Sequence, residues 1–192
     1  IPVSKHMHLV MAVPNVFFHD IEPPGKMRPL AIGEDGKAVP LEDLDIDSFG
    51  VSSYSQYTWR QLIDGWSCTP CARCQDVCPA YASGKSLNPM QVIHDVRDYA
   101  NEHAPILLSG GEPSETMMTR ISEDAVWACT TCNACVDVCP LYIEHVPKLT
   151  DLRRNAMMET MEYPEQLNVA MGNLESGSNP YGFGAHERGD WA

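Results

Sequence analysis

Residues 68–79 read Cys-Thr-Pro-Cys-Ala-Arg-Cys-Gln-Asp-Val-Cys-Pro, and residues 129–140 read Cys-Thr-Thr-Cys-Asn-Ala-Cys-Val-Asp-Val-Cys-Pro. Both runs have the spacing C-x2-C-x2-C-x3-C-P, in which three thiolates ligate one iron–sulfur cube and the cysteine before the proline ligates the other. The two runs contain all eight cysteines of the chain. We therefore expect two [4Fe–4S] clusters with crossed ligands: Cys68, Cys71, Cys74 and Cys139 at the first, and Cys129, Cys132, Cys135 and Cys78 at the second.

Zinc and disulfides are the other uses of clustered cysteines. A zinc site usually takes four ligands from two C-x2-C hooks, whereas each run here has three equally spaced cysteines and a Cys-Pro. Cysteines this crowded are poorly placed to pair within a run, and no secretory signal points to an oxidising compartment. A structural zinc-binding interaction module remains the alternative from a different functional class.

The two runs belong to an internal repeat with an offset of 61 residues, which extends from Trp66 and Trp127 to Tyr81 and Tyr142. Such a repeat predicts two pseudo-twofold-related halves, and we expect the two tryptophans to shield the clusters from water. Between the runs there is room for a long helix, a loop and a short helix. The prediction is a mainly α-helical ferredoxin rather than the compact β-rich bacterial type.

Composition limits the possible partners. The chain has 192 residues, fifteen prolines and a formal net charge of −13. This acidity argues against nucleic acid, whose binding requires basic patches. With so many cysteines and prolines, we expect a small core held together by cofactors rather than a large apolar one.

The first 53 residues differ in character from the rest. Residues 1–18 contain only one formal charge, Lys5, and we interpret them as the end of a membrane helix that leaves the lipid on the cytoplasmic side, so that the chain is a piece of a longer polypeptide. Residues 19–53 predict a linker, with a small β-hairpin formed by 28–32 and 37–41 around the turn at 33–36.

The remaining residues predict a succession of helices. Residues 54–163 are expected to form the two-cluster ferredoxin domain, and residues 164–192 a C-terminal helix and tail. Local signals place the helix ends: a helix from Tyr54 to Asp64 stopped by Gly65, one starting at Asn88-Pro89 and ending before Pro105, one capped by Ser122, and starts at Pro147 and Pro164.

Residues 66–89 and 127–154 resemble the membrane-bound iron–sulfur proteins related to the D-type subunit of heterodisulfide reductase. The fusion type, in which a cytochrome b-like membrane part precedes the ferredoxin, is that of the electron-transfer-flavoprotein:menaquinone oxidoreductases, and the resemblance covers about residues 60–192. It implies an oxidoreductase at the cytoplasmic face of the cell inner membrane. Electrons would pass from a reduced electron-transfer flavoprotein (FAD) through the two clusters towards b haem and menaquinone.

The resemblance leaves a second reading of the activity open, a respiratory heterodisulfide reductase-type subunit acting on a thiol or disulfide. The chain has no CCG repeat, so a noncubane cluster is expected only in a CCG domain that is absent here. The chain alone holds no complete substrate site.

Two histidines are of interest. Residues 2–8 are similar to the final helix of the nitrate reductase gamma-subunit family, a di-haem cytochrome b, and that likeness makes His8 a candidate axial ligand of b haem; an interfacial histidine is the alternative. His94, His103, His145 and His186 are expected on exposed faces or loops, although His145, six residues past Cys139, is placed to lie near a cluster and tune it.

Overall fold

A computed structural model describes residues 6–21, 25, 27, 29–30, 39–43, 49–111 and 113–190. The chain forms two compact units, Ile1–Asn155 and Ala156–Ala192. The described residues are mainly helical and include no strand, so the N-terminal β-hairpin is not supported. The expected turn and parts of both expected strands, residues 28 and 31–38, lie outside the described residues. Where the second strand was expected to end, a single 3-10 turn forms instead, η1 (Leu41–Asp43).

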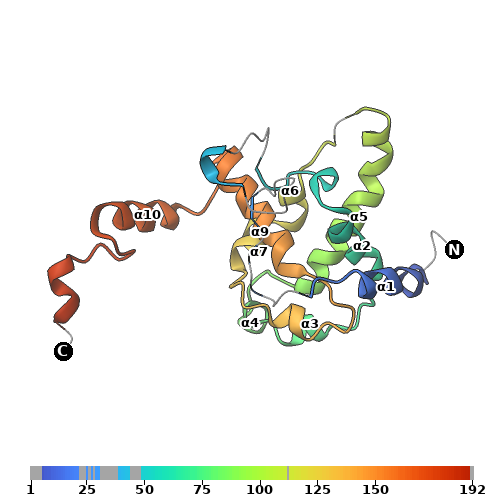
Figure 1. Cartoon of the computed structure of the whole chain (residues 1–192), viewed down its shortest axis with the longest axis horizontal. Coiled ribbons are helices and arrows are strands. Elements are labelled where there is room, and N and C mark those ends of the chain that lie inside the picture. The colour runs from blue at the N-terminus through green and yellow to red at the C-terminus, as the bar shows by residue number, and fades with distance from the viewer. Residues whose placement is uncertain are drawn as a thin grey trace. The chain divides into compact units, whose positions relative to one another are not determined.

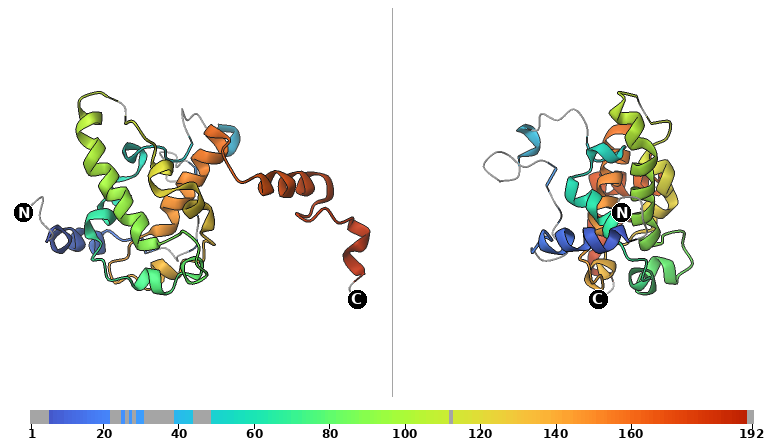
Figure 2. Two further views of the ribbon diagram at one scale, coloured as in Figure 1. Left: turned by 180° about the vertical axis from the view of Figure 1, so that it is seen from behind. Right: turned by 90° about the vertical axis from the view of Figure 1, so that its right-hand side faces the viewer.

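The N-terminal helix of the first unit is α1 (Met7–Phe17), which continues through Pro14. It packs beside α2 (Trp59–Ser67), and both views of Figure 2 keep the two helices together. Most of its apolar side chains face outward, including Val13 and Phe17, which are 71% and 78% exposed. Among the described residues, no helix combines the length and apolar character needed to cross a bilayer.

The segment before the first cysteine run is split into two helical pieces. A 3-10 turn, η2 (Tyr54–Gln56), is followed by α2, whose start is fixed by a capping box: Gln61 donates its N–H to Thr58 Oγ1, and Thr58 donates its N–H to Gln61 Oε1. The prediction that Gly65 stops this helix is wrong. Gly65 lies inside α2, which ends at Ser67. A Cβ at this position would come 2.9 Å from the Cβ of Arg97 on α5 (Pro89–Leu108), so the glycine lets the two helices approach closely.

The longest helix of the unit is α5 (Pro89–Leu108), seen as the long coil on the right of Figure 1. It starts as predicted: Asn88 Oδ1 accepts from the N–H groups of Met90 and Gln91, at 3.0 and 3.3 Å. The expected end before Pro105 is wrong, because the helix continues through Pro105 to Leu108. A proline in the last turn removes only one backbone donor, and the turn is then closed by the N–H of Ser109.

Three more helices complete the core of the first unit. They are α6 (Met117–Ile121), α7 (Glu123–Ala128) and α9 (His145–Asn155). Ser122 caps α7 as predicted, by accepting from the N–H of Ala125. The main hydrophobic core includes fully buried side chains from α5, α6, α7 and α9, namely Val96, Tyr99, Met117, Val126 and Leu152.

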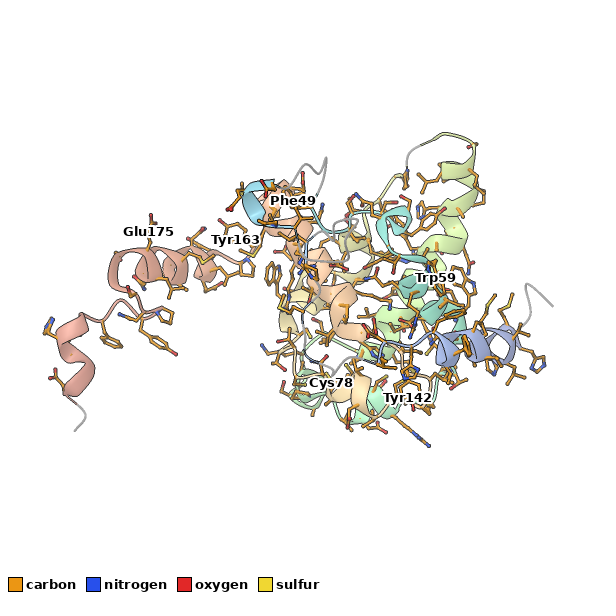
Figure 3. The ribbon with its side chains drawn as sticks, in the orientation of Figure 1. Phe49, Trp59, Cys78, Tyr142, Tyr163 and Glu175 are labelled. Atoms are coloured by element: carbon orange, nitrogen blue, oxygen red, sulfur yellow. The ribbon has the colours of Figure 1, made fainter. Side chains whose placement is uncertain are left out.

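The second unit contains η3 (Ala156–Thr160), α10 (Glu165–Gly177) and η4 (Ala185–Gly189). Pro164 is the N-cap of α10, close to the predicted start. Figure 3 labels Tyr163 beside this helix, and its hydroxyl donates to Asn168 Oδ1 at 2.8 Å. Within the described residues of this unit only Ala156 is buried.

Candidate metal centres

The two cysteine runs adopt the same local structure. The first contains α3 (Arg73–Asp76) and the second α8 (Ala134–Asp137), each preceded by a residue in the left-handed region, Ala72 at φ 63° and Asn133 at φ 60°. The carbonyls of Ala72 and Asn133 accept equivalent N–H groups two and three residues past the first helix position, at 2.9 and 3.0 Å in both runs. The sequence repeat is therefore also a structural repeat, and α3 and α8 lie in contact.

Two cavities lie at these runs. The first is lined by three cysteines of the first run and one of the second: Cys68, Cys71, Cys74 and Cys139. The second is lined by the converse set, Cys129, Cys132, Cys135 and Cys78. This is the grouping that the crossed-ligand prediction requires.

The cavities are partly open to solvent. Cys71 and Cys132, which are equivalent in the repeat, are exposed, whereas the equivalent pair Cys74 and Cys135 is buried. Figure 3 shows Cys78, a ligand candidate of the second cavity, at the end of the first unit where α3 and α4 (Pro79–Ala82) lie, opposite Phe49. One sulfur of each set is thus accessible from outside.

The more deeply placed cysteine thiols resist ionisation without a cation. Burial raises the pKa of Cys68 to about 12, and the neighbouring thiols of Cys74, Cys139 and Cys71 act in the same direction. Burial and nearby cysteines likewise raise the pKa of Cys135 to about 12. Four free thiolates cannot share one cavity without a positive charge between them. Soft sulfur donors suit positively charged iron, so the donor set fits an iron–sulfur cluster.

Apolar side chains fill most of the remaining cavity walls. Met90, Leu141 and Ile143 line the first cavity, and Leu87 and Leu149 line the second. The expected shielding by the tryptophans is not observed, because neither Trp66 nor Trp127 is among the residues that line either cavity. Apolar side chains from α5, α9 and the adjoining loops line the cavities instead.

Trp127 has a different environment. The guanidinium of Arg153 lies over its ring, 5.2 Å from the centroid. The same guanidinium donates to the carbonyls of Val126 and Cys129, each at 2.6 Å. Arg153 therefore fixes the backbone at the entrance to the second cysteine run.

A buried ionic network lies behind the first cavity. Asp64, with 0% exposure, accepts from Arg60, Lys148 and Asn15. Burial by itself would raise the pKa of Asp64, but the charges of Lys148 and Arg60 and their hydrogen bonds lower it below its ordinary value. Because α1, α2 and α9 each contribute a side chain, the network fixes these three helices to one another.

The same network holds the backbone that follows Cys139. Asn15 Nδ2 donates to the carbonyl of Leu141 at 2.9 Å, and Arg60 donates to the carbonyl of Tyr142 at 3.1 Å. Sequence reasoning missed this network; its only local signal was the i,i+4 spacing of Arg60 and Asp64. The N-terminal helix thereby contacts a segment that lines the first cavity.

His145 is the first residue of α9. It is 2% exposed and lines both cavities. Its Nδ1 is buried and has no hydrogen-bond partner in the part of the chain that the structure describes. Burial and the charge of Lys148 lower the pKa of His145 to about 4, against a smaller opposing effect of Asp64 and the Ile143 backbone.

The other histidines lie away from the cavities. His8 is a half-buried residue of α1 and lines neither cavity. His103 is 6% exposed rather than on an exposed face as expected; its ring stacks on Tyr99 at 4.2 Å between centroids, and its Nδ1 lies 3.0 Å from the Tyr99 carbonyl.

Known proteins with similar sequences agree with this site. Residues 60–140 match the family of 4Fe–4S dicluster domains. The EtfAB:quinone oxidoreductase of Syntrophomonas wolfei is 32% identical over 214 residues, which are 100% of this chain and 28% of that protein. A probable membrane-anchored ferredoxin of Chromohalobacter salexigens is 33% identical over 181 residues, or 83% of this chain and 27% of that protein.

A heterodisulfide reductase is also among the relatives. The D-type subunit of the dihydromethanophenazine:CoB–CoM heterodisulfide reductase of Methanosarcina mazei is 31% identical over 136 residues, which are 68% of this chain and 33% of that relative. The chain thus spans about a third or less of these relatives. No solved structure matches it. With its eight cysteines gathered around two cavities, the chain is an iron–sulfur electron-transfer segment related to the EtfAB:quinone oxidoreductase and the heterodisulfide reductases.

Proposed function

We propose that this segment holds two [4Fe–4S] clusters with crossed ligands and serves as a two-cluster electron path in a membrane-bound oxidoreductase. The observation that carries the proposal is the composition of the two cavities, since each draws three cysteines from one run and its fourth from the other. The ligands would be Cys68, Cys71, Cys74 and Cys139 for the first cluster, and Cys129, Cys132, Cys135 and Cys78 for the second.

When bound, such clusters supply one-electron transfer at potentials set by charge, hydrogen bonds and exposure. The residues of this chain hold the two sites in fixed relation, because Cys78 and Cys139 each join one half of the repeat to the other. The apolar side chains of Met90, Ile143 and Leu149 exclude water from the inner walls. A rigid inner wall of apolar side chains keeps the reorganisation that accompanies each electron transfer small.

We assign the donor as a reduced electron-transfer flavoprotein carrying FAD, and the destination as b haem and menaquinone. The name of the Syntrophomonas relative supports both a flavoprotein donor and a quinone acceptor. The first cavity would be nearer the acceptor, because α1 contacts its wall through Asn15 and Leu141.

The proposed location is the cytoplasmic face of the inner membrane. Two observations support membrane association: the membrane-anchored description of the Chromohalobacter relative, and the outward apolar side chains of α1, with Leu9, Val13 and Phe17 each more than 60% exposed. In this proposal residues 1–18 continue a membrane helix, residues 54–163 form the ferredoxin domain, and residues 164–192 lead to a CCG domain that would carry the noncubane cluster. His8 would be an axial ligand of b haem.

A heterodisulfide reductase-type activity on a thiol or disulfide is the second candidate, supported by the Methanosarcina relative. Both candidates use the same two clusters, so the donor and acceptor distinguish them. A heterodisulfide reductase would be oxidised by a disulfide substrate rather than by a quinone.

The test uses the full-length protein, purified without oxygen in membranes or detergent. We expect the two clusters of this segment to contribute about eight irons per chain, beyond any iron in haem or in a CCG domain, with reduction of the clusters by electron-transfer flavoprotein and reoxidation by a menaquinone analogue. Zinc in place of iron would refute the two-cluster proposal. Full iron content with no reduction by the flavoprotein would refute only the donor, and reoxidation by a disulfide alone would favour the second candidate.

A further inference from the structure

His145 is the residue that connects the two cavities. Among the residues that the structure describes, it alone lines both of them, with cysteines of the first run on one side and cysteines of the second on the other. Its 2% exposure means that the imidazole is enclosed by the surrounding protein.

The backbone around His145 is fixed from both sides. The N–H of Glu144 donates to Asp64 Oδ2 at 3.2 Å, and Lys148 Nζ donates to the carbonyl of Glu144 at 2.9 Å. Asp64 and Lys148 are themselves fully buried and paired. The imidazole is therefore attached to one of the most constrained positions of the chain and has little freedom to turn towards solvent.

Despite this constraint, Nδ1 of His145 has no partner among the described residues. A buried polar atom left unpaired costs about 1–3 kcal/mol, and such atoms are rare enough in proteins to require an explanation. The Ile143 backbone is close enough to influence the ring, but Nδ1 makes no well-formed hydrogen bond to it. The two cavities that the ring borders are lined by cysteine sulfur, and hydrogen bonds to sulfur are among the main determinants of the potential of an iron–sulfur cluster.

We propose that His145 is a tuning residue located between the two clusters, and that its Nδ1–H donates a hydrogen bond to a sulfur atom of one of them. This inference rests on the proposed two-cluster function. An imidazole can carry a proton on Nδ1 in the neutral or the charged form, so the bond does not depend on a change of protonation. Because a reduced cluster is more negative than an oxidised one, the donated bond stabilises the reduced state and raises the potential of that cluster.

The test compares His145→Leu with His145→Asn in the full-length protein. Leucine removes the donor, whereas the Nδ2 of asparagine restores a donor close to the position of Nδ1. We expect the leucine variant to lower the reduced-to-oxidised ratio of one cluster at least tenfold at a fixed ambient potential, which is about 59 mV for a one-electron couple. Asparagine should recover most of this change.

His103→Leu is the matched control. It also removes a buried histidine from the first unit, but His103 lines neither cavity and pairs with Tyr99, so both potentials should stay at their original values. Iron content and the paired cluster signal in electron paramagnetic resonance must be normal in each variant. If the unaltered protein itself lacked this iron content or the paired cluster signal, the two-cluster function would be refuted, rather than the role of His145.

A second measurement covers the case in which the leucine variant does not assemble. With ¹⁵N-histidine incorporated, the reduced unaltered protein should show a nitrogen coupled to one cluster, and His145→Asn should lose this coupling while keeping its clusters. Unchanged potentials in an iron-replete leucine variant, or no histidine coupling in the unaltered protein, would overturn the proposal.

Discussion

At the scale of single residues, the most unusual feature is that Asp64, Arg60 and Lys148 are all buried, with Asp64 and Lys148 at 0% exposure. Charged side chains are rarely so enclosed unless each has a partner. Here the one carboxylate accepts from both cations and from Asn15, and the cations also donate to Asn15 Oδ1 and to backbone carbonyls. The network therefore fixes α1, α2 and α9, which are far apart in the sequence, to one another beside the first cavity.

Asp64→Asn should therefore destabilise the protein severely. The substitution leaves the charges of Lys148 and Arg60 facing a neutral amide, and removing one member of a buried ion pair costs about 3–5 kcal/mol. The measurement is anaerobic denaturant unfolding of the iron-loaded protein.

Asp98→Asn is the control for this substitution. Asp98 also pairs with an arginine, Arg97, but 39% of its side chain is exposed, so the loss should stay below about 1 kcal/mol. Equal losses in the two variants would show that the buried network has no special role.

At the scale of the elements, local signals in the sequence predicted some helix ends and failed at others for an identifiable reason. Asn88 and Ser122 act as caps because their side chains bond N–H groups within three residues, which needs no information about the rest of the chain. Gly65 and Pro105 do not end their helices. Gly65 instead lies where α2 packs closely against Arg97, a residue that is far away in the sequence.

The cysteine spacing was informative over a longer range. The geometry of a cube imposes this spacing, which predicts crossed ligands. The cysteines that line each cavity have the grouping that this prediction requires, while the ligation itself stays a prediction. We also expected His145 near a cluster, but nothing in the sequence indicated that it would border both cavities. The buried network around Asp64 could not be predicted, since Asn15, Asp64 and Lys148 have no pattern that relates them.

A pair of double variants tests the crossed ligands directly. If ligation is crossed, Cys68→Ala with Cys139→Ala damages only the first cluster and leaves about four irons per chain, whereas Cys129→Ala with Cys139→Ala damages both. If each run instead ligated its own cluster, the first double variant would damage both clusters and the second would damage only one. Both doubles remove two thiols and share Cys139, so a general loss of stability would affect them alike, and the ratio of bound iron identifies the arrangement.

At the scale of the whole molecule, the first unit has two packing centres of different kinds. The main core is hydrophobic and lies between α5, α6, α7 and α9, whereas a smaller cluster is built around Cys74, Cys135 and Val146. The second centre has few apolar side chains of its own. Its cohesion must therefore come largely from what the cysteines bind.

Removal of iron should consequently unfold the cysteine-lined end of the first unit and weaken the rest. Without iron, four thiols crowd each cavity, and the raised pKa values of Cys68, Cys74 and Cys135 keep these sulfur atoms protonated at neutral pH, so they neither repel one another nor bind anything that closes the cavity. Since Cys78 and Cys139 cross between the halves of the repeat, each cluster joins both runs, so removing both clusters releases the two halves from each other, and metal binding and folding are coupled. Anaerobic chelation followed by circular dichroism should show a loss of helix signal and a lower, broader melting transition, both reversed by iron and sulfide. An iron-free protein that melts with the cooperativity and midpoint of the loaded one would show that the helices alone determine this fold.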